Sequence, residues 1–248
     1  YREARDAWRA DKTLRQSPSL PSVALPPELG VVPTVEAAKA LIAAEISLAR
    51  HALCRSADEA CIAAAAIGYP VAMKIESADL PHKTEAGGVL LGLSDEDAVR
   101  SAYDEIVRNA RRFKVDAAID GLIIQEMAKG GLELVVGLKR DPVFGMVIMV
   151  GLGGVFVEVL RDVVFRKAPI TPAQAEDMLR SLQGAAMLDG VRGAPPVNME
   201  ALTELIAAVS RFGAGASERV AELDLNPVLA GPERAVAVDW LLIQDRDH

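Results

Sequence analysis

The chain has 248 residues, of which 51% are hydrophobic and 25% charged, and this is the composition of an ordinary globular protein with a buried core. Its formal net charge of −8 and its pI near 5.0 argue against nonspecific binding to nucleic acid or to an anionic membrane, because both partners require a basic surface. The sequence has no apolar run of about 18 residues, and its charged N-terminus does not resemble a secretory signal, so we expect a cytoplasmic protein.

The N-terminal part of the chain is predicted to form a helix and a linker that lie outside the main fold. Residues 1–30 begin with a mixed-charge helical pattern and continue into a proline-rich stretch without any hydrophobic period. Two helices follow. Thr34 is a candidate cap for the first, while Ser56 caps the second, which ends at Gly68.

Three strands and one helix come next, in a mixed α and β order. Apolar residues predict strands over 71–76, 89–93 and 121–125. A turn with two adjacent glycines separates the first two strands. A helix that Ser94 is expected to cap connects the second strand to the third.

From residue 132 onward the sequence changes to closely spaced strands, with helices and further strands behind them. The predicted strands cover 132–140, 144–150, 155–160, 163–165, 222–229 and 235–240, and the helices begin at Thr171 and Asn198. Such short connections between strands indicate antiparallel pairing. We therefore predict an α+β fold with two lobes, one over 31–124 and one over 125–248, hinged near residues 125–131.

The strongest chemical signal is a lysine inside an apolar strand. Lys74 lies among Val71, Met73 and Ile75, and an ammonium group there is costly to desolvate unless an anion meets it. The loop that follows contains Lys83 and a pair of adjacent glycines whose backbone could approach an oxyanion closely. No GxxxxGK[ST] motif occurs, and the glycines at 151–154 lead into a strand, so neither a P-loop nor a dinucleotide fingerprint is present.

Several segments, in the same order along the chain, resemble one family. They are 68–89, 125–127, 133–137, 140–145, 151–154, 192–196 and 222–227. Together they resemble the ATP-grasp module of the NDP-forming acyl-CoA synthetases, to which the nucleotide-binding subunit of succinyl-CoA synthetase is more distantly related. The resemblance covers about 31–243 and implies an ATP-grasp fold, in which two α+β lobes with antiparallel sheets clamp a nucleotide.

The resemblance also implies which residues bind the nucleotide. The positions that match phosphate-contacting residues are Lys74, Lys83, Gly87 and Gly88. The positions that match the hinge around adenine and ribose are Gln125, Glu126 and Met127. A strand lysine can instead extend to the surface, and a hinge acid can be purely structural, so both alternatives stay open.

Four further positions match catalytic or metal-binding residues of the family. Glu133 matches a residue that contacts the nucleotide, and His82 lies in a loop where related acetyl-CoA synthetases carry a phosphoryl-relay histidine. Asn226 and Asp239 match the two ligands of Mg²⁺, whose preference for oxygen donors they satisfy. The alternatives are a solvated loop histidine and an Asn-Pro turn.

The implied function is that of an acid-thiol ligase which uses Mg²⁺ and ATP or ADP. In the family, a phosphohistidine on a CoA-binding domain carries the phosphoryl group, so we expect a partner, either an α subunit or a fused upstream half. Carboxylic acid and CoA would bind through that partner, and the chain alone would be inactive. We also expect an oligomer. Two alternatives are a regulatory module of a protein acetyltransferase-type fusion and a carbon–nitrogen ligase.

Overall fold

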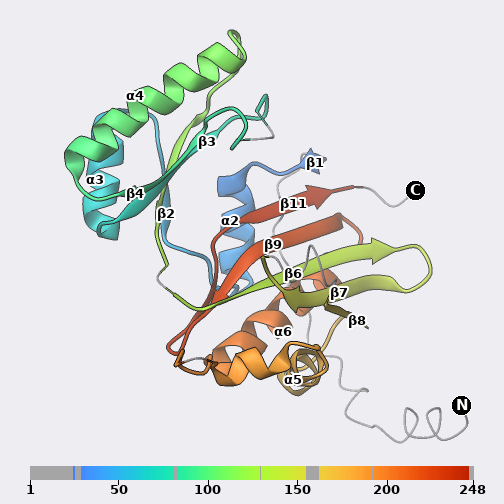
Figure 1. Cartoon of the computed structure of the whole chain (residues 1–248). Coiled ribbons are helices and arrows are strands. Elements are labelled where there is room, and N and C mark those ends of the chain that lie inside the picture. The colour runs from blue at the N-terminus through green and yellow to red at the C-terminus, as the bar shows by residue number, and fades with distance from the viewer. Residues whose placement is uncertain are drawn as a thin grey trace, which may run out of the picture.

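Two antiparallel β-sheets, each packed against helices, make up the part of the chain that the computed structural model describes (Figure 1). The described residues are 25, 29–80, 83–128, 130–154, 162–191 and 193–245. The smaller sheet has the strand order β2-β5-β3-β4, and the larger has the order β1-β11-β9-β6-β7-β8 with β10 beside β9. The predicted N-terminal helix and the predicted strand over 155–160 lie outside the described residues.

The small lobe contains the first mixed α and β segment of the chain. Its elements are β2 (His51–Cys54), α3 (Ala57–Ile67), β3 (Val71–Glu76), β4 (Val89–Leu93), α4 (Glu96–Phe113) and β5 (Gly121–Glu126). Ser56 caps α3 as predicted, since its side chain accepts a hydrogen bond from the backbone amide of Glu59, and Gly68 ends the helix with a φ of 97°. The predicted Ser94 cap is wrong by one residue, because the Asp95 carboxylate accepts from the amide of Ala98 at 2.8 Å.

Strand alternation decides which way the side chains of β3 point. Val71, Met73 and Ile75 are fully buried in the core that the small sheet forms with α3 and α4. Lys74 and Glu76 alternate with them and therefore lie on the opposite face of the sheet. That face is turned toward the other lobe, so the two charged residues lie between the lobes.

The large lobe contains the long meander and both ends of the described chain. Its elements are β1 (Gly30–Val31), α2 (Thr34–Ala43), β6 (Leu132–Asp141), β7 (Gly145–Leu152), β8 (Val163–Lys167), α5 (Pro172–Arg180), η3 (Ala185–Asp189), α6 (Met199–Gly215), β9 (Val220–Ala230), β10 (Ala235–Ala237) and β11 (Trp240–Gln244). The predicted strand over 235–240 is in fact two strands, because the chain bends at Val238. None of the helices in the described ranges is long and apolar enough to cross a membrane.

The first helix packs in the large lobe, although the sequence assigned residues from 31 onward to the first lobe. β1 pairs with β11, and the buried face of α2, which includes Ala37 and Leu41, belongs to the large-lobe core. Thr34 is the first helical residue and not the cap. The N-cap position is Pro33, which has no side-chain hydrogen bond to offer.

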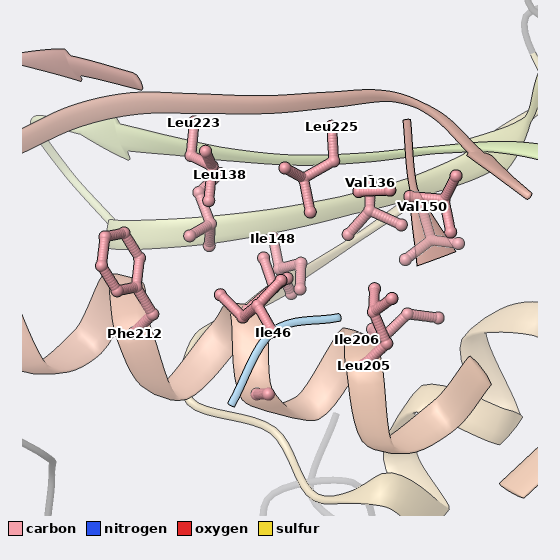
Figure 2. Close-up of a cluster of buried hydrophobic side chains, with 14 of the residues drawn as sticks. Ile46, Val136, Leu138, Ile148, Val150, Leu205, Ile206, Phe212, Leu223 and Leu225 are labelled. Atoms are coloured by element: carbon pink, nitrogen blue, oxygen red, sulfur yellow. The ribbon is translucent and has the colours of Figure 1, made fainter. Parts of the chain in front are cut away.

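The core of the large lobe orients β9. Helix α6 presents Leu205, Ile206 and Phe212 to one face of the large sheet, where they meet Leu223 and Leu225 of β9 (Figure 2). All five side chains are 3% exposed or less. The intervening and following polar residues of β9 must then face away from the helix, toward the small lobe.

We expect Phe212→Ala to destabilise the chain by about 3–5 kcal/mol, because it removes a fully buried ring and leaves a cavity. The matched control is Phe113→Ala at the end of α4, where the ring is 60% exposed and the change should stay within about 0.5 kcal/mol. Urea unfolding followed by circular dichroism measures both. Equal midpoints for the two variants would contradict the assignment of Phe212 to the core.

Candidate functional site

A cavity of about 740 Å³ lies between the two lobes and brings together most of the charged residues singled out in the sequence. Lys74 and Lys83 enter it from β3 and the loop that follows β3. Asn226 and Asp239 enter it from β9 and from the bend before β11. Residues from distant parts of the chain therefore meet in one cleft.

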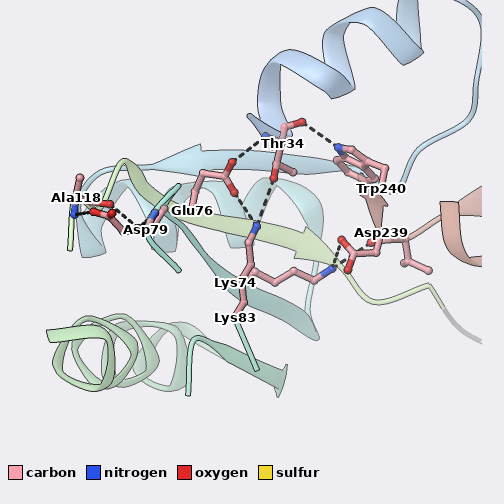
Figure 3. Close-up of polar contacts among 10 residues, drawn as sticks. Thr34, Lys74, Glu76, Asp79, Lys83, Ala118, Asp239 and Trp240 are labelled. Atoms are coloured by element: carbon pink, nitrogen blue, oxygen red, sulfur yellow. Dashed lines mark hydrogen bonds and ion pairs between the residues drawn. The ribbon is translucent and has the colours of Figure 1, made fainter. Parts of the chain in front are cut away.

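Lys74 crosses the cleft toward the large lobe. Its ammonium group lies 3.5 Å from Oδ1 of Asp239 and donates a hydrogen bond to the carbonyl oxygen of Val238 at 3.1 Å (Figure 3). The lysine side chain is 17% exposed, whereas that of Asp239 is 59% exposed. The ammonium group therefore meets a carboxylate inside the cleft, and this carboxylate belongs to one of the two expected metal ligands. The expected contact of Lys74 with phosphate stays a prediction.

Lys83 is held by a residue that the sequence did not single out. Its ammonium lies 2.8 Å from Oε2 of Glu76 and 3.4 Å from the hydroxyl oxygen of Thr34. The other carboxylate oxygen of Glu76 accepts from the backbone amide of Thr34 at 2.8 Å. Glu76 stands two residues after Lys74 on β3, so strand alternation alone could have placed it on the cleft face.

The paired glycines shape the loop, but their amides do not point into the cleft. The amide of Gly87 donates to the carbonyl oxygen of Thr84, and the amide of Gly88 donates to that of Lys83 at 2.7 Å. Gly87 has a φ of 62°, and a Cβ on Gly88 would lie 2.5 Å from a methyl group of Ile75. The turn itself therefore requires both glycines. His82, the expected relay histidine, lies outside the described residues.

Oxygen donors gather on the large-lobe side of the cleft. The backbone amide of Asn226 donates to the carbonyl oxygen of Asp239 at 3.3 Å, so the two expected metal ligands lie on adjacent backbone segments. Asp224 lines the same cavity, and burial, followed by the charges of Glu222 and Asp239, raises the pKa of its carboxyl group.

This donor set fits Mg²⁺. Hard cations prefer carboxylate and amide oxygens, and Mg²⁺ is usually held by one or two protein carboxylates, with water and substrate phosphates completing its shell. In the described ranges, no group of three or more His, Cys, Asp or Glu residues forms a closed metal cage. Asn226 and Asp239 therefore provide an open, partial site.

The hinge residues are engaged in contacts of their own. Gln125 is 2% exposed, and its side-chain amide donates to the carbonyl oxygen of Val238 at 2.8 Å. Glu126 accepts from Arg50 at 2.8 Å and lies 3.1 Å from Arg234. Burial opposes ionisation of Glu126, but the hydrogen bond from Arg50 and the ion pair with Arg234 hold the pKa of its carboxyl group below the usual value. These two side chains therefore connect the lobes.

A second cavity of about 570 Å³ opens at the hinge. Its walls combine apolar and polar groups, among them Tyr69, Met127, Leu229 and the two arginines that hold Glu126. Glu133 lines neither cavity. Its side chain is exposed, and its carbonyl oxygen accepts from the amide of Gly153 at 2.7 Å. Glu133 is thus not among the residues that line the cleft with Lys74 and Lys83.

Comparisons with known proteins agree with the fold. A family model described as an ATP-grasp domain matches residues 24–243. The β subunit of acetate–CoA ligase (ADP-forming) I from Pyrococcus furiosus is 44% identical over 189 residues, which is 76% of this chain and 81% of the relative. The 4-hydroxybutyrate–CoA ligase (ADP-forming) of Nitrosopumilus maritimus is also 44% identical, over 78% of this chain, but the match spans only 28% of that longer relative.

Solved structures show the same likeness. Acetyl-coenzyme A synthetase 1 of Ca. Korarchaeum cryptofilum, in complex with coenzyme A and Ca-AMPCP, has a TM-score of 0.83 and 40% identity over 87% of this chain and 94% of that chain. Another structure of that enzyme contains Mg-AMPPCP and a phosphohistidine segment pointing towards the nucleotide-binding site, with a TM-score of 0.77 and 38% identity over 87% and 93%. The predicted α+β ATP-grasp fold is confirmed: the chain belongs to the ATP-grasp family, in the branch that contains the β subunits of ADP-forming acyl-CoA ligases.

Proposed function

We propose that the chain is the nucleotide-binding half of an NDP-forming acyl-CoA synthetase, an acid-thiol ligase. It binds a magnesium nucleotide between its lobes and transfers a phosphoryl group between ATP or ADP and a phosphohistidine of a CoA-binding partner. The observation that carries this proposal is the convergence of Lys74 and Lys83 with Asn226 and Asp239 on one cleft. A related acetyl-coenzyme A synthetase has a phosphohistidine segment that points towards a nucleotide site with Mg-AMPPCP, which supports transfer between a phosphohistidine and a nucleotide.

The transfer requires little covalent chemistry from this chain. A phosphorus–nitrogen bond of the phosphohistidine breaks as a phosphorus–oxygen bond to ADP forms, and the reverse reaction exchanges the two bonds. The protein must hold the two reactants in line and balance the negative charge on the phosphoryl oxygens. Lys74 and Lys83 provide positive charge from one wall of the cleft.

The charge of the cleft explains why the nucleotide should enter as a metal complex. Two lysines and five carboxylates line the cavity, and the carboxylates are Glu76, Glu85, Asp120, Asp224 and Asp239. This excess of negative charge repels an uncomplexed polyphosphate. Asn226 and Asp239 would hold Mg²⁺, which would neutralise part of the phosphate charge when bound.

The base of the nucleotide and the CoA-binding partner would bind at other parts of the chain. The hinge cavity, with the apolar side chains of Met127 and Leu229, is of a suitable size for the base. From the family resemblance, Glu133 is assigned to a catalytic contact with the nucleotide and His82 to phosphoryl relay. The partner is a CoA-binding domain, either a separate subunit or a fused half, which also binds the carboxylic acid. We propose that this chain and its CoA-binding partner form an oligomer.

Lys74→Ala should weaken binding of Mg-ADP by about 1–3 kcal/mol, since it removes a charge-assisted contact to phosphate. Calorimetric titration of the 248-residue chain measures this, and we expect wild-type binding in the micromolar range, about −8 kcal/mol. Lys139→Ala is the matched control, because Lys139 is 77% exposed on β6 and pairs only with Glu222 among the described contacts. Unchanged affinity in a folded Lys74→Ala chain would exclude the phosphate role.

Asn226→Ala and Asp239→Asn should each raise the Mg²⁺ concentration that half-saturates nucleotide binding by at least about tenfold, or about 1.4 kcal/mol. Both variants are needed, because Asp239 also pairs with Lys74 whereas Asn226 does not. Glu222→Gln, on the same strand as Asn226 but outside the cleft lining, is the control. Nucleotide binding that persists unchanged in EDTA would show that the site needs no metal.

Transfer of label from γ-³²P-ATP separates catalysis from regulation. A CoA-binding subunit with its phosphorylatable histidine should become labelled by the wild-type chain with Mg²⁺, and labelling should be lost with Lys74→Ala. The same subunit with that histidine replaced is the negative control. Tight nucleotide binding without any label on the partner would instead indicate a regulatory module.

A further inference from the structure

We propose that Glu76, which has no part in the transfer described above, is a positioning residue for Lys83. Its carboxylate joins the ammonium group of Lys83 to the N-terminus of helix α2 in the other lobe, and so holds this loop lysine at a fixed place in the cleft. The inference rests on the proposed function, in that Lys83 is taken to contact phosphate.

Both oxygens of Glu76 have partners from outside its own strand. One lies 2.8 Å from the ammonium of Lys83, and the other accepts from the amide of Thr34 at 2.8 Å. The side chain of Glu76 is 10% exposed. A carboxylate this buried is costly unless it is paired and hydrogen-bonded, and here the two contacts together meet that need.

The carboxylate of Glu76 caps the N-terminus of helix α2. Its N-cap residue is Pro33, which makes no side-chain capping bond, so the amide of Thr34 would otherwise lack a partner of this kind. A negative charge is also favourable at the positive end of a helix dipole. Glu76 of the small lobe thus accepts the hydrogen bond from the amide of Thr34 that the N-cap residue of the large-lobe helix cannot accept.

The connection continues to the strand that follows the metal ligand. The carbonyl oxygen of Thr34 accepts from the indole nitrogen of Trp240 at 2.9 Å, and Trp240 directly follows Asp239 (Figure 3). A series of contacts therefore runs from Lys83 through Glu76 and Thr34 to β11. It fixes where the loop lysine stands relative to the metal side of the cleft.

The geometry favours positioning over competition with phosphate. An ammonium group has three donors, and the contacts to Glu76 and Thr34 use two of them, so one can point to a ligand. A free lysine side chain loses rotamer entropy when it is ordered, and Glu76 removes this cost before the nucleotide arrives. If Glu76 merely neutralised Lys83, its removal would strengthen nucleotide binding instead.

Glu76→Gln tests the two possibilities, because glutamine keeps an acceptor for the amide of Thr34 but loses the negative charge that anchors Lys83. We expect it to weaken Mg-ADP binding by about 3- to 10-fold in calorimetry. Lys83→Met should weaken binding to a similar extent, and the double variant should bind no more weakly than Lys83→Met alone. Binding by Glu76→Gln as tight as wild type, or tighter, would overturn the proposal.

Thr34→Pro tests the anchor, by which we mean the hydrogen bond from the amide of Thr34 to the Glu76 carboxylate that holds Lys83. Proline lacks the amide but is favoured at the first helical position, and the ψ of 140° at Pro33 suits a residue before proline. With Trp8→Phe as background, loss of the anchor should shift the emission of Trp240 and weaken Mg-ADP binding. Thr34→Val, which keeps the amide, should bind more tightly than Thr34→Pro.

The outcomes separate this inference from the proposed function. If the wild-type chain binds Mg-ADP and Lys74→Ala weakens that binding, but the Glu76 and Thr34 variants do not, only the positioning role fails. If the wild-type chain does not bind Mg-ADP, the proposed function fails, and the anchor is judged by the emission of Trp240. Unchanged emission in Thr34→Pro would then overturn it.

Discussion

The contact on which the site depends is the one between Lys74 and the segment of Val238 and Asp239. The lysine is largely buried, but its acidic partner is 59% exposed, and an ion pair with one exposed member contributes at most about 1 kcal/mol to stability. Stability alone therefore does not account for an ammonium group in the middle of an apolar strand. A polyphosphate with its metal would provide the charge that the present partners provide only in part.

The lobes have separate hydrophobic cores and meet through polar contacts. Lys74 and Gln125 reach the carbonyl of Val238, Glu76 reaches the amide of Thr34, and Glu126 lies between Arg50 and Arg234. Polar contacts of this kind can be exchanged for contacts to a ligand without exposing apolar surface. Because each lobe has its own hydrophobic core and the contacts between the lobes are polar, the cleft can accept a charged nucleotide.

Local patterns predicted the small lobe well and failed where tertiary contacts decide. The strands over 71–76 and 89–93 have the predicted bounds, because their apolar residues mark them clearly. Helix α2 was assigned to the wrong lobe, since the strand that attaches it, β1, has only two residues and no periodic signal. Sequence motifs identified Lys74, Lys83, Asn226 and Asp239, which the structure places in one cleft. The motifs could not show that the amides of Gly87 and Gly88 form hydrogen bonds within their own turn. Glu76 was missed because the family resemblance gave it no role, although it lies within the matching segment 68–89.

A crystal structure of the 248-residue chain with Mg-AMPPCP would show directly whether the nucleotide and its metal bind in this cleft. We expect the metal to contact the side chains of Asn226 and Asp239, and the phosphates to lie between this metal and the ammonium groups of Lys74 and Lys83. A nucleotide bound elsewhere, with the contact between Lys74 and Asp239 intact and the cleft empty, would contradict it.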